Sequence, residues 1–443
     1  MQTYRPYLLV ILGLLAPLSA IAQEAAVPAE PELDLSAELP IDESVLKGRL
    51  DNGLTYLIRE NQKPENRAEL WLVVNAGSIQ ENDDQQGLAH FVEHMAFNGT
   101  RNFEKQDLVN YLESIGMTFG PDINAFTSFD ETVYNLTIPT DDEETVATAF
   151  QILEDWAHGL AFDDEEIDKE RGVVVEEWRL GRGAEARIRD KQFPILFKGS
   201  RYAERLPIGK KEILESAPYE ALRSYYRDWY RPDLMAVIAI GDFDTESVQK
   251  RIHQHFSKLK APPEPRARDI YPVPDHDGDL FAITTDPEAT MTSIGVYYKL
   301  PKAPQGTAGD YRRQIVEQIY HGMVNARLGE LTQEADPPFL YGVSASAGIV
   351  RSSDFYIQAA GVREGQVIRG LEALLTEAER ADRFGFTETE LARMKADLLR
   401  AYEQAYAERD KRESGSYASE YMRHFLDGES IPGIEMELAM VQE

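Results

Sequence analysis

Strand-like and helix-like patterns alternate along this chain, and the same order occurs twice, on either side of a proline-rich stretch. In the first half, two short strand patterns flank Asp51-Asn52-Gly53, whose Asn-Gly pair suits a tight hairpin turn. A strand pattern at 68–76 and a helical pattern at 87–97 follow. Beyond Ala261-Pro-Pro-Glu-Pro, strand patterns again precede long helical ones. The repeat predicts two α+β units, each a sheet with helices packed on one side.

The helical and strand patterns can be assigned by their periods. Helical spacing of apolar residues extends over 105–115, 143–158, 164–180, 219–230, 245–259, 311–331, 365–384 and 388–406. Alternating or short apolar runs at 131–138, 235–240, 280–284, 292–300, 341–349 and 353–361 predict strands.

Composition and pattern together divide the chain into five parts. Arg5, the apolar run 8–18 and Ala20-Ile21-Ala22 are typical of a secretory signal with its cleavage site. We therefore expect a signal peptide at 1–22, a disordered tether at 23–42, a catalytic αβ domain at 43–260, a linker at 261–277 and a second αβ domain at 278–443. After cleavage, no later stretch reaches the roughly 20 apolar residues of a membrane span, which predicts a secreted or periplasmic protein.

The second unit is shorter than the first. Leu206-Pro-Ile-Gly in the first unit precedes a helix, a strand and a final helix, whereas the chain stops soon after the similar Ile431-Pro-Gly-Ile. The sequence therefore indicates an incomplete second domain in a fragment or half of something longer. The alternative is that the second unit is merely smaller.

Charge and cysteine content restrict the possible partners. There are 46 Lys and Arg against 77 Asp and Glu, a net charge of −31, which opposes binding to nucleic acid. The chain has no cysteine, so disulfides, thiolate metal sites and cysteine nucleophiles are excluded. Any metal must be held by His, Asp and Glu.

The segment at 87–98 carries the clearest chemistry. It reads as a helix that Asp83 and Asp84 could cap, and on it His90 and His94 project from one face, one turn apart. Two neutral imidazoles at this spacing suit one zinc ion, and Glu93 lies on the same side, next to where a bound water would sit. The order His-x-x-Glu-His is the reverse of His-Glu-x-x-His and has the same parts.

A third ligand must come from elsewhere, and the acidic helical segment at 168–178 is the best candidate. Glu170 and Glu177 are seven residues apart and so face the same way. Glu177 lies between apolar residues, which argues for burial and a functional need. Physical reasoning alone does not choose between Glu176 and Glu177.

Three stretches resemble one family of peptidases. GLAHFVEHMAFNGT from Gly87, NAFTSFDETVY from Asn124 and ERGVVVEEWR from Glu170 are similar to the insulinase and pitrilysin group of zinc peptidases, family M16, and most of all to its periplasmic members from Gram-negative bacteria. The resemblance implies that zinc is bound by three residues of this chain: His90, His94 and Glu177. It further implies that Glu93 is the general base, that Glu170 supports the site from behind, and that Asn124 with Ala125 forms the strand edge receiving substrate.

The predicted function is a secreted or periplasmic zinc endopeptidase with one zinc ion per chain, acting on peptides or small proteins. Members of the family usually complete the site with an Arg and a Tyr seven residues apart, given by a second half. Here Tyr341 is preceded seven residues earlier by Glu334, so this pair is missing. We expect the partner to be a second half, either a missing C-terminal half or a dimer partner. The alternatives are a catalytically weak half, an assembly subunit, or a periplasmic metal carrier.

Overall fold

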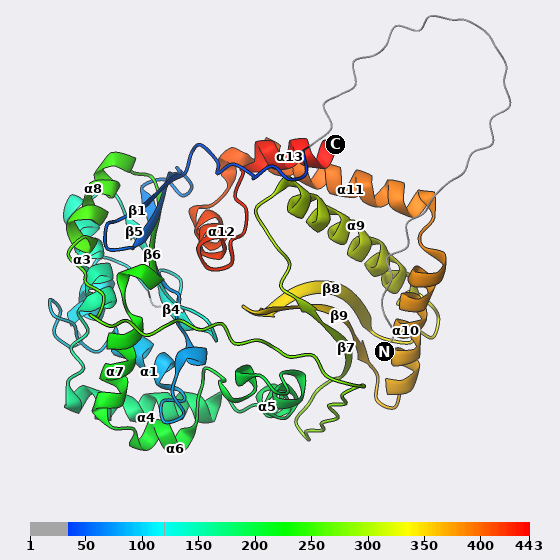
Figure 1. Cartoon of the computed structure of the whole chain (residues 1–443), viewed down its shortest axis with the longest axis horizontal. Coiled ribbons are helices and arrows are strands. Elements are labelled where there is room, and N and C mark those ends of the chain that lie inside the picture. The colour runs from blue at the N-terminus through cyan, green and yellow to red at the C-terminus, as the bar shows by residue number, and fades with distance from the viewer. Residues whose placement is uncertain (1–33, 106, 119) are drawn as a thin grey trace, which may run out of the picture.

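The computed structural model describes residues 34–105, 107–118 and 120–443 (Figure 1). The two α+β units expected from the sequence are both present. They are connected by residues 257–291, a fully described segment that contains no helix or strand. The expected signal peptide at 1–22 and the first part of the expected tether, 23–33, lie outside the described residues.

The first unit contains a six-stranded sheet of mixed direction. Only the β2–β6 pair is parallel, and every other neighbouring pair is antiparallel. Strand β6 is buried along its whole length, because it lies in the middle of the sheet with a helical layer on each side. In spatial order the strands are β1 (Leu46–Arg49), β2 (Thr55–Glu60), β6 (Met235–Gly241), β3 (Arg67–Val74), β5 (Thr132–Pro139) and β4 (Ile123–Thr127).

One face of this sheet is covered by helices of the same unit. Leu70 and Leu72 of β3 point into a large apolar core together with Phe91 and Trp156 from the helices. The helices of this unit are α1 (Leu88–Met95), α2 (Asp107–Ser114), α3 (Glu143–His158), α4 (Asp164–Leu180), α5 (Ala184–Leu196), α6 (Lys211–Ser216), α7 (Tyr219–Trp229) and α8 (Thr245–Phe256). Short 3-10 turns lie at Ser78–Gln80, Arg201–Glu204 and Pro232–Leu234.

The opposite face of the first sheet is covered by a helix from the other end of the chain. Helix α12 (Ser414–Asp427) places Tyr417 and Tyr421 against Leu57, Val73 and Ile238 of the sheet. Figure 1 shows α12 between the first sheet and the second unit. The two units are thus joined by a shared apolar core as well as by the connecting segment.

The second unit is smaller. Its three antiparallel strands lie in the order β7 (Thr292–Pro301), β9 (Ser353–Val362) and β8 (Tyr341–Val350). Helices α9 (Ala308–Leu331) and α10 (Val367–Phe384) cover one face, where Val324, Leu328 and Leu374 form a core with β9. Helix α11 (Glu388–Ala407), a 3-10 turn at Arg409–Lys411 and helix α13 (Ile434–Gln442) complete the unit.

Two expectations about the segments between the helices differ from the structure. The strand pattern at 280–284 does not form a strand: Phe281 and Ile283 are 75% and 90% exposed and pair with no neighbouring strand. The last part of the expected tether is held against the second unit, because Leu39 N–H donates to Gly306 and Ala308 N–H donates to Ala37. The short apolar run at 280–284 was therefore not sufficient for a strand, because strand formation depends on pairing and packing with neighbours.

Within the described residues, no helix combines the length and the apolar character needed to cross a membrane.

Candidate metal centre

Helix α1 begins at a glycine whose backbone only glycine adopts readily. Gly87 has φ 101°, and a Cβ built on it would lie 2.9 Å from Leu214 Cδ2 and 3.0 Å from Gly209 Cα. The expected cap from Asp83 or Asp84 is wrong. Instead the buried Glu81 Oε1 accepts hydrogen bonds from the N–H groups of Gly87 (3.0 Å) and Ala89 (2.8 Å). Burial raises the pKa of Glu81 to about 8 in spite of these two hydrogen bonds.

One side of α1 is locked into the core of the first unit. Leu88, Phe91, Val92 and Met95 are fully buried. This fixes the rotation of the helix, so that His90 and His94 face α4, with their rings 4.7 Å apart and almost perpendicular. The sequence prediction of one shared face is confirmed.

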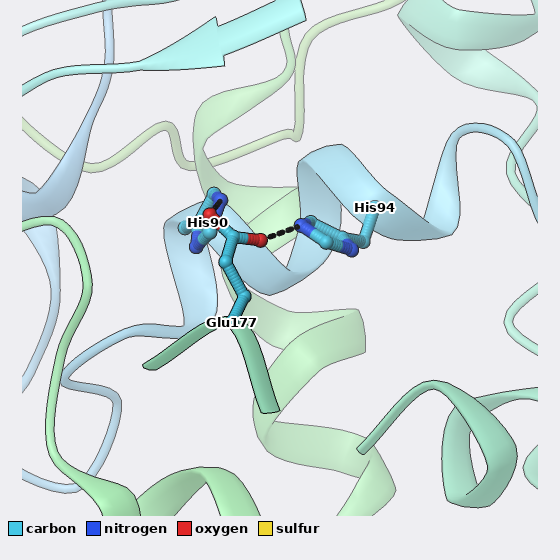
Figure 2. Close-up of side chains that lie close together, drawn as sticks. All are labelled: His90, His94 and Glu177. Carbon is cyan, nitrogen blue, oxygen red and sulfur yellow. Dashed lines mark ion pairs between the residues drawn. The ribbon is translucent and has the colours of Figure 1, made fainter. Parts of the chain in front are cut away.

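Helix α4 brings Glu177 to the two histidines. Its Oε2 lies 3.1 Å from His94 Nε2, and its Oε1 lies 3.6 Å from His90 Nε2. Figure 2 shows the carboxylate of Glu177 pointing at both rings. Glu176, the alternative that the sequence left open, points to solvent and forms an ion pair with Arg179.

Glu170 of α4 contacts the ring nitrogen of His94 that points away from Glu177. Glu170 Oε1 lies 2.7 Å from Nδ1 of His94, and both side chains are largely buried. Burial alone would lower the pKa of His94, but the hydrogen bonds to Glu170 and Glu177 raise it to about 9. A pKa of about 9 means that both ring nitrogens of His94 are protonated near neutral pH, Nδ1 facing Glu170 and Nε2 facing Glu177. A metal ion that binds at Nε2 would displace the proton on that nitrogen.

The geometry fits a divalent metal ion. His90, His94 and Glu177 each offer one ligand atom, and these atoms lie within 4.8 Å of one another. Burial lowers the pKa of His90 to about 4, so its imidazole is neutral, as a metal ligand must be. His90 Nδ1 is buried with no hydrogen-bond partner in the described part of the chain. Two imidazole nitrogens with one carboxylate are a donor set of catalytic zinc, which leaves a fourth position open.

Glu93 lies beside this group and is not part of it. It is only 7% exposed, and its Oε2 accepts a hydrogen bond of 2.6 Å from Thr127 Oγ1 at the end of β4. Burial raises the pKa of Glu93 to about 7 in spite of that bond. A carboxyl group with such a pKa can both accept and release a proton near neutral pH.

Strand β4 is the edge of the sheet next to the site. Asn124 and Ala125, which the resemblance implicated in substrate binding, both lie on it, opposite Asn135 and Tyr134 of β5. In the structure the Asn124 side chain accepts a hydrogen bond from the Ala125 N–H (2.9 Å). Sequence reasoning missed Glu81 and the contact that the Thr127 side chain makes with Glu93. The only available signal for Thr127 was its place in the stretch that follows Asn124.

A two-unit α+β fold in which a His-x-x-Glu-His helix faces an acidic helix is the arrangement of the inverzincin class of metallopeptidases. Residues 56–185 match the family model described as insulinase (peptidase family M16), and residues 216–398 match that described as the peptidase M16 inactive domain. The crystal structure of the first half of the periplasmic protease PqqL from Escherichia coli is 31% identical, with a TM-score of 0.86 over 92% of this chain and 87% of that one. The chain belongs to the insulinase family of peptidases, family M16.

Two curated relatives are much longer than this chain. A zinc protease PQQL-like protein of Arabidopsis thaliana is 37% identical over 391 residues, which are 88% of this chain and 38% of that protein. The probable zinc protease PqqL of Escherichia coli K12 is 33% identical over 382 residues, 85% of this chain and 41% of that protein. This chain spans about two fifths of the length of these relatives.

Proposed function

We propose that this chain is the zinc-binding half of a peptidase that hydrolyses peptide bonds with a metal-activated water. The observation that carries the proposal is the convergence of His90, His94 and Glu177, whose ligand atoms lie within 4.8 Å of one another, with Glu93 adjacent. The names of the relatives, which are zinc proteases, support the same metal and reaction class.

The reaction assigns a separate task to each residue. A bound zinc ion would polarise the scissile carbonyl and lower the pKa of a coordinated water towards about 7. His90, His94 and Glu177 would hold the ion, and Glu170 orients the His94 ring so that Nε2 faces Glu177. Glu93 takes the proton from the attacking water and returns it to the leaving amine.

The free edge of β4 supports binding of substrate as an added strand. Hydrogen bonds from Ser128 N–H to Glu131 (2.8 Å) and from Thr137 N–H to Asp122 (2.7 Å) bracket the β4–β5 pair. In an antiparallel ladder, hydrogen-bonded residue pairs alternate with pairs that are not hydrogen-bonded to each other. The backbone N–H and C=O groups of Asn124 and Phe126 therefore point towards β5. Ala125 and Thr127 therefore direct N–H and C=O outwards. An extended peptide can pair with both groups of Thr127 and with the C=O of Ala125, whose N–H already donates to the Asn124 side chain.

The proposed location and partner rest on the N-terminal sequence pattern and on the relatives. The signal-like pattern at 1–22 and the periplasmic protease PqqL among the similar structures favour the periplasm. A second M16 half, in the same polypeptide or as a partner, would face the site, in keeping with the greater length of the relatives. The natural substrate class we propose is unfolded peptides or small proteins, since strand pairing reads the main chain.

Peptide cleavage tests this function. The zinc-loaded chain is incubated with a mixture of unstructured peptides, and the products are identified by mass spectrometry, with and without a zinc chelator. We expect new peptide ends that disappear with chelator and return with added zinc. Cleavage that persists in the metal-free protein would refute the proposal. The proposal would also be refuted if the zinc-loaded chain, mixed with the second half of a PqqL-type relative, cleaved no peptide.

A further inference from the structure

The contact between Thr127 and Glu93 joins two parts of the site that are 34 residues apart in sequence. Thr127 is the last residue of β4. Its side chain lies on the same face as Ile123 and Ala125, which pack on the core that includes α1. There its Oγ1 donates to Glu93 Oε2 at 2.6 Å. Among the described residues, the Glu93 carboxylate is hydrogen-bonded through Oε2, which leaves Oε1 for another partner.

The backbone of the same residue belongs to the open edge. On the outer side of β4, Ile123 is already engaged, because its N–H donates to Thr118 and its C=O accepts from Gly120. The Ala125 N–H is bound by the Asn124 side chain. Within the described part of the chain, the outward N–H and C=O of Thr127 have no backbone partner.

We propose that Thr127 is a positioning residue that links substrate pairing to the general base. Its backbone pairs with the incoming peptide strand, while its hydroxyl holds the Glu93 carboxylate with Oε1 directed towards the attacking water. This inference rests on the proposed peptidase function. A strand added at β4 would fix Thr127, and through the hydrogen bond it would fix Glu93 at the moment when substrate is in place.

The hydroxyl of Thr127 is suited to this task for a physical reason. Glu93 is buried, and loss of the Thr127 hydroxyl would remove the hydrogen bond that its carboxylate makes with the described residues. That loss would cost free energy and favour rotation of the side chain towards another partner. A β-branched residue has few χ1 rotamers, which keeps the hydroxyl in place. Replacing threonine by valine removes the donor and nearly preserves the shape.

The test compares zinc-loaded Thr127→Val, Thr127→Ser and wild type on one internally quenched peptide that the wild type cleaves. The matched control is Thr137→Val, which removes a hydrogen bond of the same type, from Thr137 Oγ1 to Glu69 Oε1 (3.0 Å), on the neighbouring strand. For Thr127→Val we expect full zinc content, an unchanged KM and a kcat lowered at least about tenfold. Thr127→Ser should recover kcat to within about threefold of the wild type, since it restores the donor.

Two results would overturn the inference: a kcat of Thr127→Val equal to that of Thr137→Val, or a rise in KM at constant kcat. If Thr127→Val does not fold, Thr127→Ala removes the same hydroxyl with less crowding. A crystal structure of either variant provides a readout that does not need turnover. A Glu93 carboxylate that keeps its position without the hydroxyl would refute the positioning role, whereas failure of the wild type to cleave any peptide would count only against the peptidase proposal.

Discussion

Glu170 Oε1 lies 2.7 Å from Nδ1 of His94, while Nε2 of the same ring faces Glu177 at 3.1 Å. The imidazole is thus held between two carboxylates of one helix, seven residues apart. A hydrogen bond from the far nitrogen fixes both the ring orientation and the nitrogen that is free for a metal. His90 has no such support in the described part of the chain, because its Nδ1 is without a partner.

Replacing Glu170 by alanine should weaken zinc binding about 10- to 100-fold, because the His94 ring loses its orienting acceptor. The measurement is a zinc titration in competition with a coloured chelator. Glu165→Ala, an exposed acid on the same helix, is the matched control and should bind zinc as the wild type does. Equal affinities in the two variants would show that Glu170 has no supporting role.

Replacing Glu177 by alanine should abolish stoichiometric zinc binding, whereas Glu176→Ala should leave it intact. Glu177 faces both histidines, while Glu176 forms an exposed ion pair with Arg179. Metal content after zinc loading and gel filtration is measured by elemental analysis. Equal loss in both variants would contradict the assignment of the third ligand.

Glu93→Gln should keep zinc and lose hydrolysis by about 100-fold or more, because an amide of the same shape cannot accept the proton of the attacking water. Both quantities are measured on one preparation, so that loss of metal is separated from loss of the base. A fully metallated variant with wild-type kcat would remove Glu93 from the mechanism.

The predictable part of this structure depends on local spacing. The helices at Glu143–His158 and Asp164–Leu180 and the common face of His90 and His94 follow from the 3.6-residue period alone. Glu81, which caps α1, and Thr127, which bonds Glu93, act through contacts made by the folded chain, and no short pattern encodes them. The same holds for Tyr417 and Tyr421, whose partners on the first sheet are distant in sequence. Leu57, for example, precedes Tyr421 by 364 residues.

The contact of α12 with the first sheet should contribute strongly to stability. Tyr421 is 1% exposed in that core, so Tyr421→Ala leaves a large cavity and should lower the free energy of unfolding by about 3 kcal/mol or more. Tyr298→Ala, at a residue that is 54% exposed, is the control and should change it little. Urea unfolding followed by tryptophan fluorescence measures both. Equal midpoints would contradict the shared core.

Stability should also fall as pH rises through the neutral range, because of Glu437 on α13. Burial and the nearby Glu420 raise the pKa of Glu437 to about 7. A raised pKa in the folded state favours the protonated form. Its contribution, at most about 3 kcal/mol, is therefore fully present below about pH 4.5 and is lost as pH rises through about 7.

Glu437→Gln should reduce this pH dependence, since glutamine stays neutral throughout. Melting temperatures measured between pH 5 and 8 compare the variant with the wild type. The wild type should lose more stability over this interval than Glu437→Gln. Parallel curves would show that Glu437 is not the group responsible.

Anomalous X-ray scattering at the zinc edge, from crystals of the zinc-loaded chain, tests the central claim most directly. We predict one strong peak per chain, bonded to Nε2 of His90, Nε2 of His94 and the carboxylate of Glu177. No peak at this position with zinc in excess, or a peak held by other residues, would contradict the metal centre on which the proposed function depends.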